Sequence, residues 1–131
     1  MNKNKSVIKN LLSYTVIIIV LLMASCEGGT TFTKTIENKS SETIIIKLYT
    51  VYGSNDPITI NSYESKEIYW DDQMGRFVDD SYNCMDVIDT VEITITNNKK
   101  LLKDIMDSAN WLNESKGGRN SREDCTFIIT D

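Results

Sequence analysis

Hydrophobic and polar positions divide the chain into an apolar N-terminal run and a longer part in which the two kinds of residue alternate. Residues 11–25 carry no charged side chain. From residue 31 onward, short stretches alternate apolar with polar residues, and a period of two is typical of a β-strand with one buried face. The clearest stretch is 90–96, where Val91, Ile93 and Ile95 alternate with polar residues. The pattern therefore predicts a β-structured domain behind a short apolar segment.

Seven stretches with strand-like patterns can be distinguished, and residues that favour turns separate them. They are 31–37, 43–52, 58–60, 66–70, 90–96, 101–105 and 125–130. Within them we expect Phe32, Ile36 and Trp70 to face the core. The fold class that follows is all-β, an antiparallel β-sandwich of about seven short strands.

Two details of strand arrangement also follow from the pattern. Residues 43–52 are apolar on both faces for half their length, which predicts a central strand packed on two sides. The polar residues 38–42 contain Asn and Ser, whose side chains bond readily to nearby backbone amides. We therefore expect a hairpin between the first strand and the second.

Two segments interrupt the alternation. Residues 71–86 show no periodicity and predict a long acidic loop, a type of segment that is often functional. Its aspartates are Asp71, Asp72, Asp79, Asp80 and Asp86. In 99–111, apolar residues recur at helical spacing, so a helix there is the alternative to the strand at 101–105. We expect Asn110-Trp111-Leu112 to dock the next irregular segment on the core.

The apolar run has the features of a secretory signal. Lysines precede it at positions 3, 5 and 9, and its 15 residues fall short of the roughly 20 that a membrane-spanning helix needs. It ends in Leu22-Met23-Ala24-Ser25-Cys26, a lipobox in which small residues precede a cysteine. We expect cleavage before Cys26 and acylation of its thiol, with an uncleaved anchor or a plain secreted protein as the alternatives.

This interpretation sets the domain organisation of the chain. Residues 1–25 form a lipoprotein signal peptide, residues 26–30 form a flexible tether, and residues 31–131 form the β-sandwich domain. Removing the signal leaves 106 of the 131 residues, which suffice for one domain and are too few for two.

The part of the chain beyond the signal is strongly acidic. The signal holds three of the 14 basic residues and none of the 19 acidic ones, so 11 basic and 19 acidic residues remain, a net charge of −8. Nucleic acid phosphates would be repelled by this charge, which argues against nucleic acid as a partner. A basic protein or a divalent cation is compatible with it.

Candidate catalytic chemistry is sparse. The chain has no histidine, which removes the usual general base and the commonest zinc ligand. It also has no Gly-x-Ser-x-Gly nucleophile motif. The aspartate pairs 71–72 and 79–80 could in principle act as paired carboxylates. The acidic loop could hold Ca²⁺, although its spacing matches no familiar Ca²⁺ loop. We expect a non-enzyme with no catalytic residue, no metal site and no cofactor.

Two cysteines remain once Cys26 is assigned to the lipid. Cys84 lies near the end of the acidic loop, and Cys125 begins the last expected strand. An even number of cysteines in an exported domain indicates a disulfide. We therefore expect a Cys84–Cys125 bond, with two unpaired thiols as the alternative.

The order of strands and turns resembles a known group of proteins. The resemblance is carried by residues 60–69 and 86–96, the Asn-Lys-Lys turn that follows, Asn110-Trp111 and the terminal strand. Together these are similar to the small uncharacterised β-sandwich lipoproteins of Bacteroidota-like bacteria. The resemblance implies lipid anchoring in the cell envelope, at an outer membrane and facing the periplasm or the cell surface. It implies no activity. It also makes Ser108, within Asp107-Ser108-Ala109, a candidate O-glycosylation site.

Two classes of function follow from these observations. The first is a non-catalytic, membrane-anchored envelope lipoprotein that binds a protein or a glycan. The second is an inhibitor or immunity-type lipoprotein that acts on a basic lytic enzyme such as lysozyme, which the charge of −8 favours. In both cases the acyl chains on Cys26 would hold the protein on the membrane.

Overall fold

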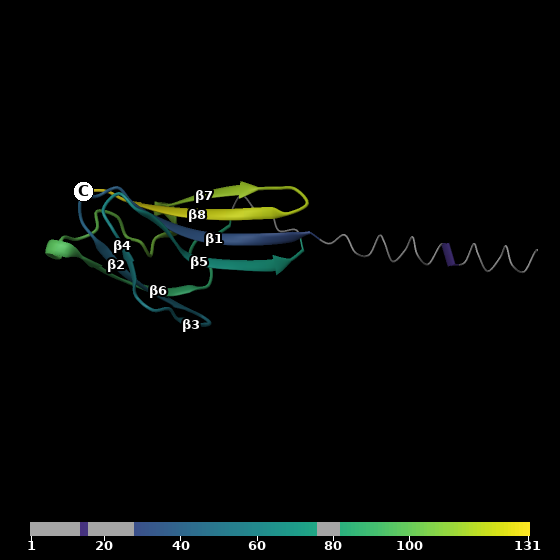
Figure 1. Ribbon diagram of the computed structural model, residues 1–131, viewed down its shortest axis with the longest axis horizontal. Helices are drawn as coiled ribbons and strands as arrows, with labels where there is room; N and C mark the ends of the chain where they lie inside the picture. The colour runs from purple at the N-terminus through teal and green to yellow at the C-terminus, as the bar shows by residue number, and fades with distance from the viewer. Residues whose placement is uncertain (1–13, 16–27, 76–81) are drawn as a thin grey trace, which may run out of the picture.

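Two four-stranded β-sheets pack face to face in the computed structural model, which describes residues 14–15, 28–75 and 82–131 (Figure 1). The first sheet has the strand order β5-β1-β8-β7. Its strands are β1 (Gly29–Asn38), β5 (Ser65–Met74), β7 (Trp111–Lys116) and β8 (Ser121–Ile129). The all-β sandwich expected from the alternation is confirmed.

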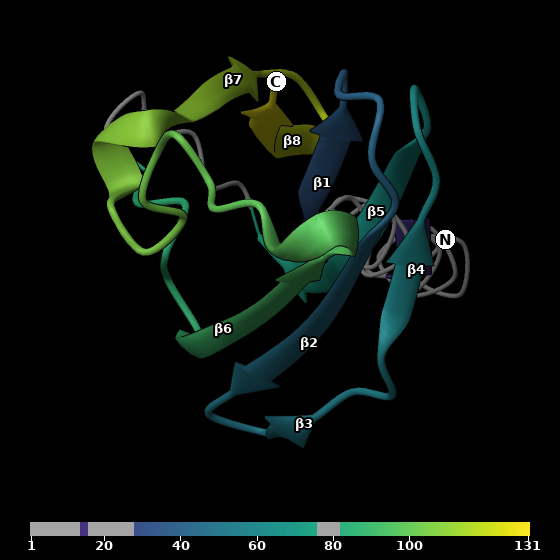
Figure 2. The same ribbon diagram turned by 90° about the vertical axis from the view of Figure 1, so that its left-hand side faces the viewer.

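The second sheet is built around β2. It comprises β2 (Ile44–Thr50), β3 (Gly53–Ser54), β4 (Ile58–Ile60) and β6 (Ile88–Ile95). Strand β2 pairs with β6 along one edge and with β4 and then β3 along the other (Figure 2). The central position expected for this strand is confirmed, but packing on both of its faces is wrong. Ile44 and Ile46 are fully buried, whereas Ile45 between them is 41% exposed.

The core lies between the sheets and is made by residues at every second position of their strands. Buried apolar side chains of β1, β5 and β8 face those of β2 and β4, because alternation places one set of side chains on the inner face. The innermost are Ile36, Ile44, Ile46, Leu48, Ile60 and Phe127, each with no more than 1% of its surface exposed. Phe32 is also buried, so the core positions expected on the first strand are confirmed.

The connection after β1 leads to the other sheet and not into a hairpin. Strand β1 pairs antiparallel with β5 and parallel with β8, and it has no pairing with β2. The expected hairpin is therefore wrong, and β1–β8 is a parallel pair within an otherwise antiparallel set. The turn chemistry expected at 38–42 is real. Asn38 donates to the carbonyls of Glu42 (2.8 Å) and Asn61 (2.9 Å), and its Oδ1 accepts from Ser40, so this side chain links the two layers.

A β-bulge in β5 changes which side chains reach the core. Lys34 of β1 is opposite Tyr69 and the next residue, Thr35, is opposite Glu67, so Ile68 is an extra residue on β5. An extra residue shifts the alternation that follows it by one position. Ile68 is buried, but Trp70 is 57% exposed. The expectation that Trp70 is a core residue is wrong for this reason.

The segment expected to be an acidic loop is partly strand. Strand β5 continues to Met74, so Asp71 and Asp72 are paired residues of the first sheet, opposite Phe32 and Thr31. Asp79 and Asp80 lie outside the described residues. Asp86 belongs to a turn in which its amide donates to the carbonyl of Asn83. Continued pairing with β1 overrides the weak periodicity of 71–74.

Residues 99–110 form neither the strand nor the helix that the sequence pattern predicted as alternatives. Two short 3₁₀ helices, η1 (Thr96–Asn98) and η2 (Ser108–Asn110), flank an irregular segment. Its only buried apolar side chain is Ile105, whose carbonyl accepts a 2.8 Å hydrogen bond from Nε1 of Trp111. Trp111 is buried on the core with its ring 5.4 Å from that of Phe127, but it docks the irregular segment before it and not the one expected after it. The strand that begins at Trp111, β7, was not expected.

The N-terminal boundary of the domain lies earlier than expected. Gly29 and Thr30, assigned to the tether, are the first residues of β1. Thr30 is buried, and its hydroxyl donates to the carbonyl of Gly75 at 2.9 Å. Cys26 lies outside the described residues. Within the described part of the chain, no helix has the length and apolar character needed to cross a membrane.

Candidate functional site

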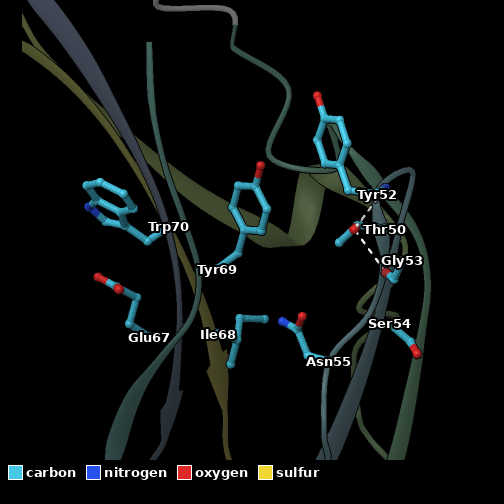
Figure 3. Close-up of a pocket in the computed structure, with 9 residues that line it drawn as sticks. All are labelled: Thr50, Tyr52, Gly53, Ser54, Asn55, Glu67, Ile68, Tyr69 and Trp70. Atoms are coloured by element: carbon cyan, nitrogen blue, oxygen red, sulfur yellow. Dashed lines mark hydrogen bonds between the residues drawn. The ribbon is translucent and has the colours of Figure 1, made fainter.

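An open cleft of about 380 Å³ lies where the edges of the two sheets approach each other. One wall is the β2–β3 turn, with Thr50 and residues 52–55, and the other is the segment 67–70 of β5 (Figure 3). Ligand sites in proteins are typically concavities of about 300–1,000 Å³ with aromatic walls and a few placed polar groups. The cleft has this size and carries aromatic side chains, although its lining is more polar than apolar, and we refer to it as the aromatic cleft.

Three aromatic side chains border the aromatic cleft. Tyr52 is 77% exposed and Trp70 is 57% exposed, while Tyr69 is partly buried. Trp70 lies on one side of the β5 ribbon, and Tyr69 and Tyr52 lie on the other (Figure 3). The bulge at Ile68 produces this arrangement, because it turns Tyr69 toward the second sheet and Trp70 to the outer face.

The β2–β3 turn that carries Tyr52 is fixed by its own hydrogen bonds. The hydroxyl of Thr50 donates to the carbonyl of Gly53 at 3.0 Å and accepts from the amide of Tyr52 at 3.2 Å. The amide of Asn55 donates to the carbonyl of Leu48 at 3.1 Å. Gly53 has a φ of +131°, a conformation open to glycine and rarely to other residues. The wall of the cleft is therefore held in place without a ligand.

Polar residues line both walls of the cleft, and Figure 3 shows the Asn55 side chain pointing toward β5 and that of Ser54 pointing away from it. Ser54 and Asn55 are exposed on the β2–β3 turn, and Glu67 is exposed on β5. Asn55 offers the cleft an amide that both donates and accepts, and Glu67 offers a carboxylate that accepts. Glu67 is the sole Asp, Glu, Lys or Arg among the described lining residues. The cleft is thus aromatic and polar, with a single charged group.

A second aromatic cluster lies inside the sandwich, around Lys34. This side chain is fully buried on β1, and its Nζ donates to the carbonyl of Cys84 at 2.7 Å and to the hydroxyl of Tyr82 at 3.3 Å. The same Nζ lies 5.1 Å from the ring centre of Tyr82 and 5.6 Å from that of Tyr69. Such cation–π contacts partly replace the water that a buried ammonium loses.

Burial changes the acid–base properties of this interior cluster. It lowers the pKa of Lys34 to about 8, although the negative charge of Asp86 acts in the opposite direction. Burial also raises the pKa of the Tyr82 hydroxyl, and the charge of Asp86 adds to this effect. A small cavity of about 90 Å³ adjoins the cluster between Phe32, Tyr69 and Tyr82. The tyrosine rings of this cluster therefore contact the protein's own Lys34 side chain.

The two cysteines expected to pair are brought together beside Lys34. Cys84 and Cys125 form a disulfide, with their Cα atoms 5.6 Å apart. Cys125 lies in the middle of β8, opposite Lys34 of β1, and does not begin the strand as expected. The bond therefore attaches residues 82–86 to the centre of the first sheet. This attachment holds Tyr82 over Lys34.

The other residues singled out in the sequence do not converge. Within the described residues, no group of three or more Asp, Glu, His or Cys side chains is placed to hold a metal ion. Asp71 and Asp72 are successive strand residues, so their side chains point to opposite faces of the sheet. Ser108 is exposed at the start of η2, and its glycosylation stays a prediction.

The aromatic cleft was not expected from the sequence. Its β5 wall was assigned to the core, and its other wall was assigned to a simple loop. One signal was present, because Tyr52 directly precedes the turn-forming residues 53–57, and aromatic residues are enriched at interaction surfaces. The position of Trp70 depends on the bulge and could not have been predicted from alternation.

Comparisons with known proteins do not assign this chain to a family. The chain matches no protein-family model, no curated protein and no solved structure. The class that the structure itself defines is a small disulfide-containing β-sandwich with an open aromatic cleft at one edge.

Proposed function

We propose that this chain is a non-catalytic, lipid-anchored protein of the cell envelope whose β-sandwich binds its ligand in the aromatic cleft. The observation that carries the binding function is the exposure of Trp70 and Tyr52 on the walls of a preformed cleft. Large apolar side chains grouped at one exposed site commonly mark a place of interaction.

The lipid anchor in this proposal is supported by the lipobox that ends at Cys26 and by the lysines before it. Strand β1 begins at Gly29, so only two residues separate Cys26 from the first sheet. Acyl chains on Cys26 would keep the sandwich close to the membrane surface, and two or three chains are needed for stable attachment.

Anchoring and binding are tested separately. For anchoring, radiolabelled fatty acid should enter the wild-type chain and not the Cys26→Ala variant, and equal labelling of both would contradict the lipid anchor. For binding, the purified domain should retain an envelope component that the double variant Tyr52→Ala/Trp70→Ala loses.

Tyr63 offers a matched control for the binding test. It is an exposed tyrosine in the turn before β5, and it lines none of the described cavities. Its φ of +58° is tolerated by asparagine, so Tyr63→Asn removes an exposed ring without straining the turn. Retention that is equal in the wild type, the control and the double variant would contradict a function of the cleft.

The inhibitor interpretation makes a different prediction. An acidic inhibitor should lower lysozyme activity at low salt through charge, and added salt should relieve the inhibition. Loss of Trp70 should leave that effect unchanged. Inhibition with this salt dependence, together with no role for the cleft, would replace the present proposal.

A further inference from the structure

We propose that the ligand of the aromatic cleft is a neutral oligosaccharide. This inference rests on the proposed binding function of the cleft and names its ligand class. A sugar ring has two faces of C–H groups and a rim of hydroxyls. It is therefore complementary to a site that combines flat aromatic rings with side chains able to donate and accept hydrogen bonds.

The aromatic cleft provides both kinds of group. Trp70 and Tyr52 present broad apolar surfaces to solvent, on which the C–H face of a sugar can lie. Asn55 can donate to and accept from hydroxyls, and Glu67 accepts from them. Since the β2–β3 turn is already held by Thr50, little ordering of the protein would oppose binding.

The arrangement of these groups favours a chain of sugars over a single one. Trp70 and Glu67 lie on one side of β5, while Tyr52, Tyr69 and Asn55 lie on the other (Figure 3). One sugar unit cannot contact both sets, because the strand edge stands between them. An oligosaccharide that crosses this edge can place one unit against Trp70 and another against Tyr52.

Charge excludes acidic polysaccharides from the preferred ligands. Glu67 gives the described lining its one formal charge, and the chain beyond the signal has a net charge of −8. Uronic acids, sulfated sugars and phosphates would be repelled by both. A neutral sugar has no charge, so this negative charge does not oppose its binding.

A peptide that adds a strand to the free edge of β5 is the competing ligand class. Strand addition needs an accessible edge and apolar pockets for alternate side chains. Here Lys66 donates from its Nζ to the carbonyl of Thr59 at 2.6 Å, which ties the beginning of β5 to β4. The remaining edge carries Glu67, Asp71 and Asp72, and charges on an edge strand disfavour pairing.

The test uses the purified full mature domain and defined sugars. The probes are cellohexaose, mannohexaose and the hexamer of N-acetylglucosamine, with glucose and N-acetylglucosamine as single units and polygalacturonate as the acidic polymer. Binding is measured by titration calorimetry and by acrylamide quenching of tryptophan fluorescence. Trp70 should dominate the quenching, because Trp111 is buried.

We expect at least one neutral hexamer to bind and to protect Trp70 from acrylamide, with much weaker binding of single sugars and of polygalacturonate. Trp70→Ala and Tyr52→Ala should each weaken binding about tenfold, the loss expected for one stacking contact. Tyr63→Asn should leave the dissociation constant unchanged. Both cleft variants should keep the wild-type circular dichroism, since they alter exposed side chains.

Two results would overturn the inference, and they differ in what else they overturn. If none of the hexamers binds, but envelope capture still depends on Trp70 and Tyr52, the ligand is not a neutral sugar and the cleft keeps its function. A peptide that binds in a Trp70-dependent manner would identify the competing class. If neither hexamers nor envelope capture depends on these residues, the inference and the proposed function both fail.

Discussion

Tyr69 and Trp70 are neighbours in the sequence and both border the aromatic cleft, yet only Tyr69 also reaches the interior cluster around Lys34. Tyr69 contributes to the interior cluster, where a buried lysine, a second tyrosine and a disulfide are packed together. Trp70 belongs to the aromatic cleft, where it is more than half exposed. Both regions are aromatic and polar, and β5 contributes a side chain to each.

The two regions differ in what holds their aromatic side chains. In the interior cluster, Tyr82 is held by the Cys84–Cys125 bond and contacts a cation supplied by the protein itself. In the cleft, Tyr52 is held through a turn of the backbone, and its ring faces solvent. The interior rings therefore already contact a cation of the protein itself, whereas the cleft rings keep exposed surface that a ligand can contact. Substitutions should therefore affect stability in the first region and binding in the second.

The largest expected effect is on the disulfide. The double variant Cys84→Ala/Cys125→Ala should lower the free energy of unfolding by about 4 kcal/mol, because the bond spans 41 residues and restricts the unfolded chain. Urea denaturation of the variant and the wild type measures the difference. A change below about 1 kcal/mol would show that the interior region does not depend on this bond. Ligand binding in the cleft should survive in the folded fraction.

The next effect is a dependence of stability on pH that comes from Lys34. Its pKa is about 8 in the folded protein and 10.5 when unperturbed, so between these values the unfolded chain binds more protons. Stability should therefore rise as the pH increases from 8 toward 10, by up to about 3 kcal/mol. Above pH 10 it should fall, because the raised pKa of Tyr82 keeps its hydroxyl protonated only in the folded state.

The variant Lys34→Met isolates this contribution. Methionine has a similar length and no charge, so the rise between pH 8 and 10 should disappear while the fold is retained. Urea denaturation at pH 7, 8, 9 and 10 gives the comparison. A wild-type profile that is flat over this range would contradict a lowered pKa for Lys34.

A smaller effect is expected at the turn of the cleft. Gly53→Ala introduces a side chain at a φ of +131°, which should cost about 1–3 kcal/mol through backbone strain. The added methyl group has no atom within 4 Å, so a clash makes no contribution. Loss of affinity for the cleft ligand should accompany the loss of stability. Unchanged stability would mean that the turn adapts.

The smallest effect on stability should come from Trp70. Trp70→Ala should lower the free energy of unfolding by less than about 1 kcal/mol, since a surface substitution removes little buried area. The matched interior change, Phe127→Ala, should cost about 3–5 kcal/mol because that ring is buried. Thermal unfolding of both variants distinguishes the two regions directly. A large loss at Trp70 would place it in the core.

Local chemistry was sufficient to predict parts of the fold and of the site. The strand at 90–96 was predicted because alternation of apolar and polar residues indicates a strand with one buried face, and this holds for any pairing partner. The pairing of Cys84 with Cys125 was predicted because an even number of cysteines, in a domain expected to be exported, indicates a disulfide. Asn38 is the last residue of β1 and not part of the turn, but its side chain bonds to backbone groups of residues 40 and 42 as its turn chemistry predicted.

The errors concern contacts between segments far apart in the chain. The sequence could not indicate that β1 pairs in parallel with β8, or that β1 and β2 lie in different sheets. It also could not place the extra residue at Ile68, because a bulge exists only relative to the paired strand. The aromatic cleft follows from that bulge, so it was missed along with it.

The sequence by itself therefore determined the all-β class, most strand positions and the cysteine pair, because alternation and composition act locally. The tertiary structure alone decided strand order, the burial of Lys34 and the exposure of Trp70. The physical reason is that inward and outward directions are defined by pairing partners. The one-residue shift between β1 and β5 directs Trp70 to solvent, whereas simple alternation would place it in the core.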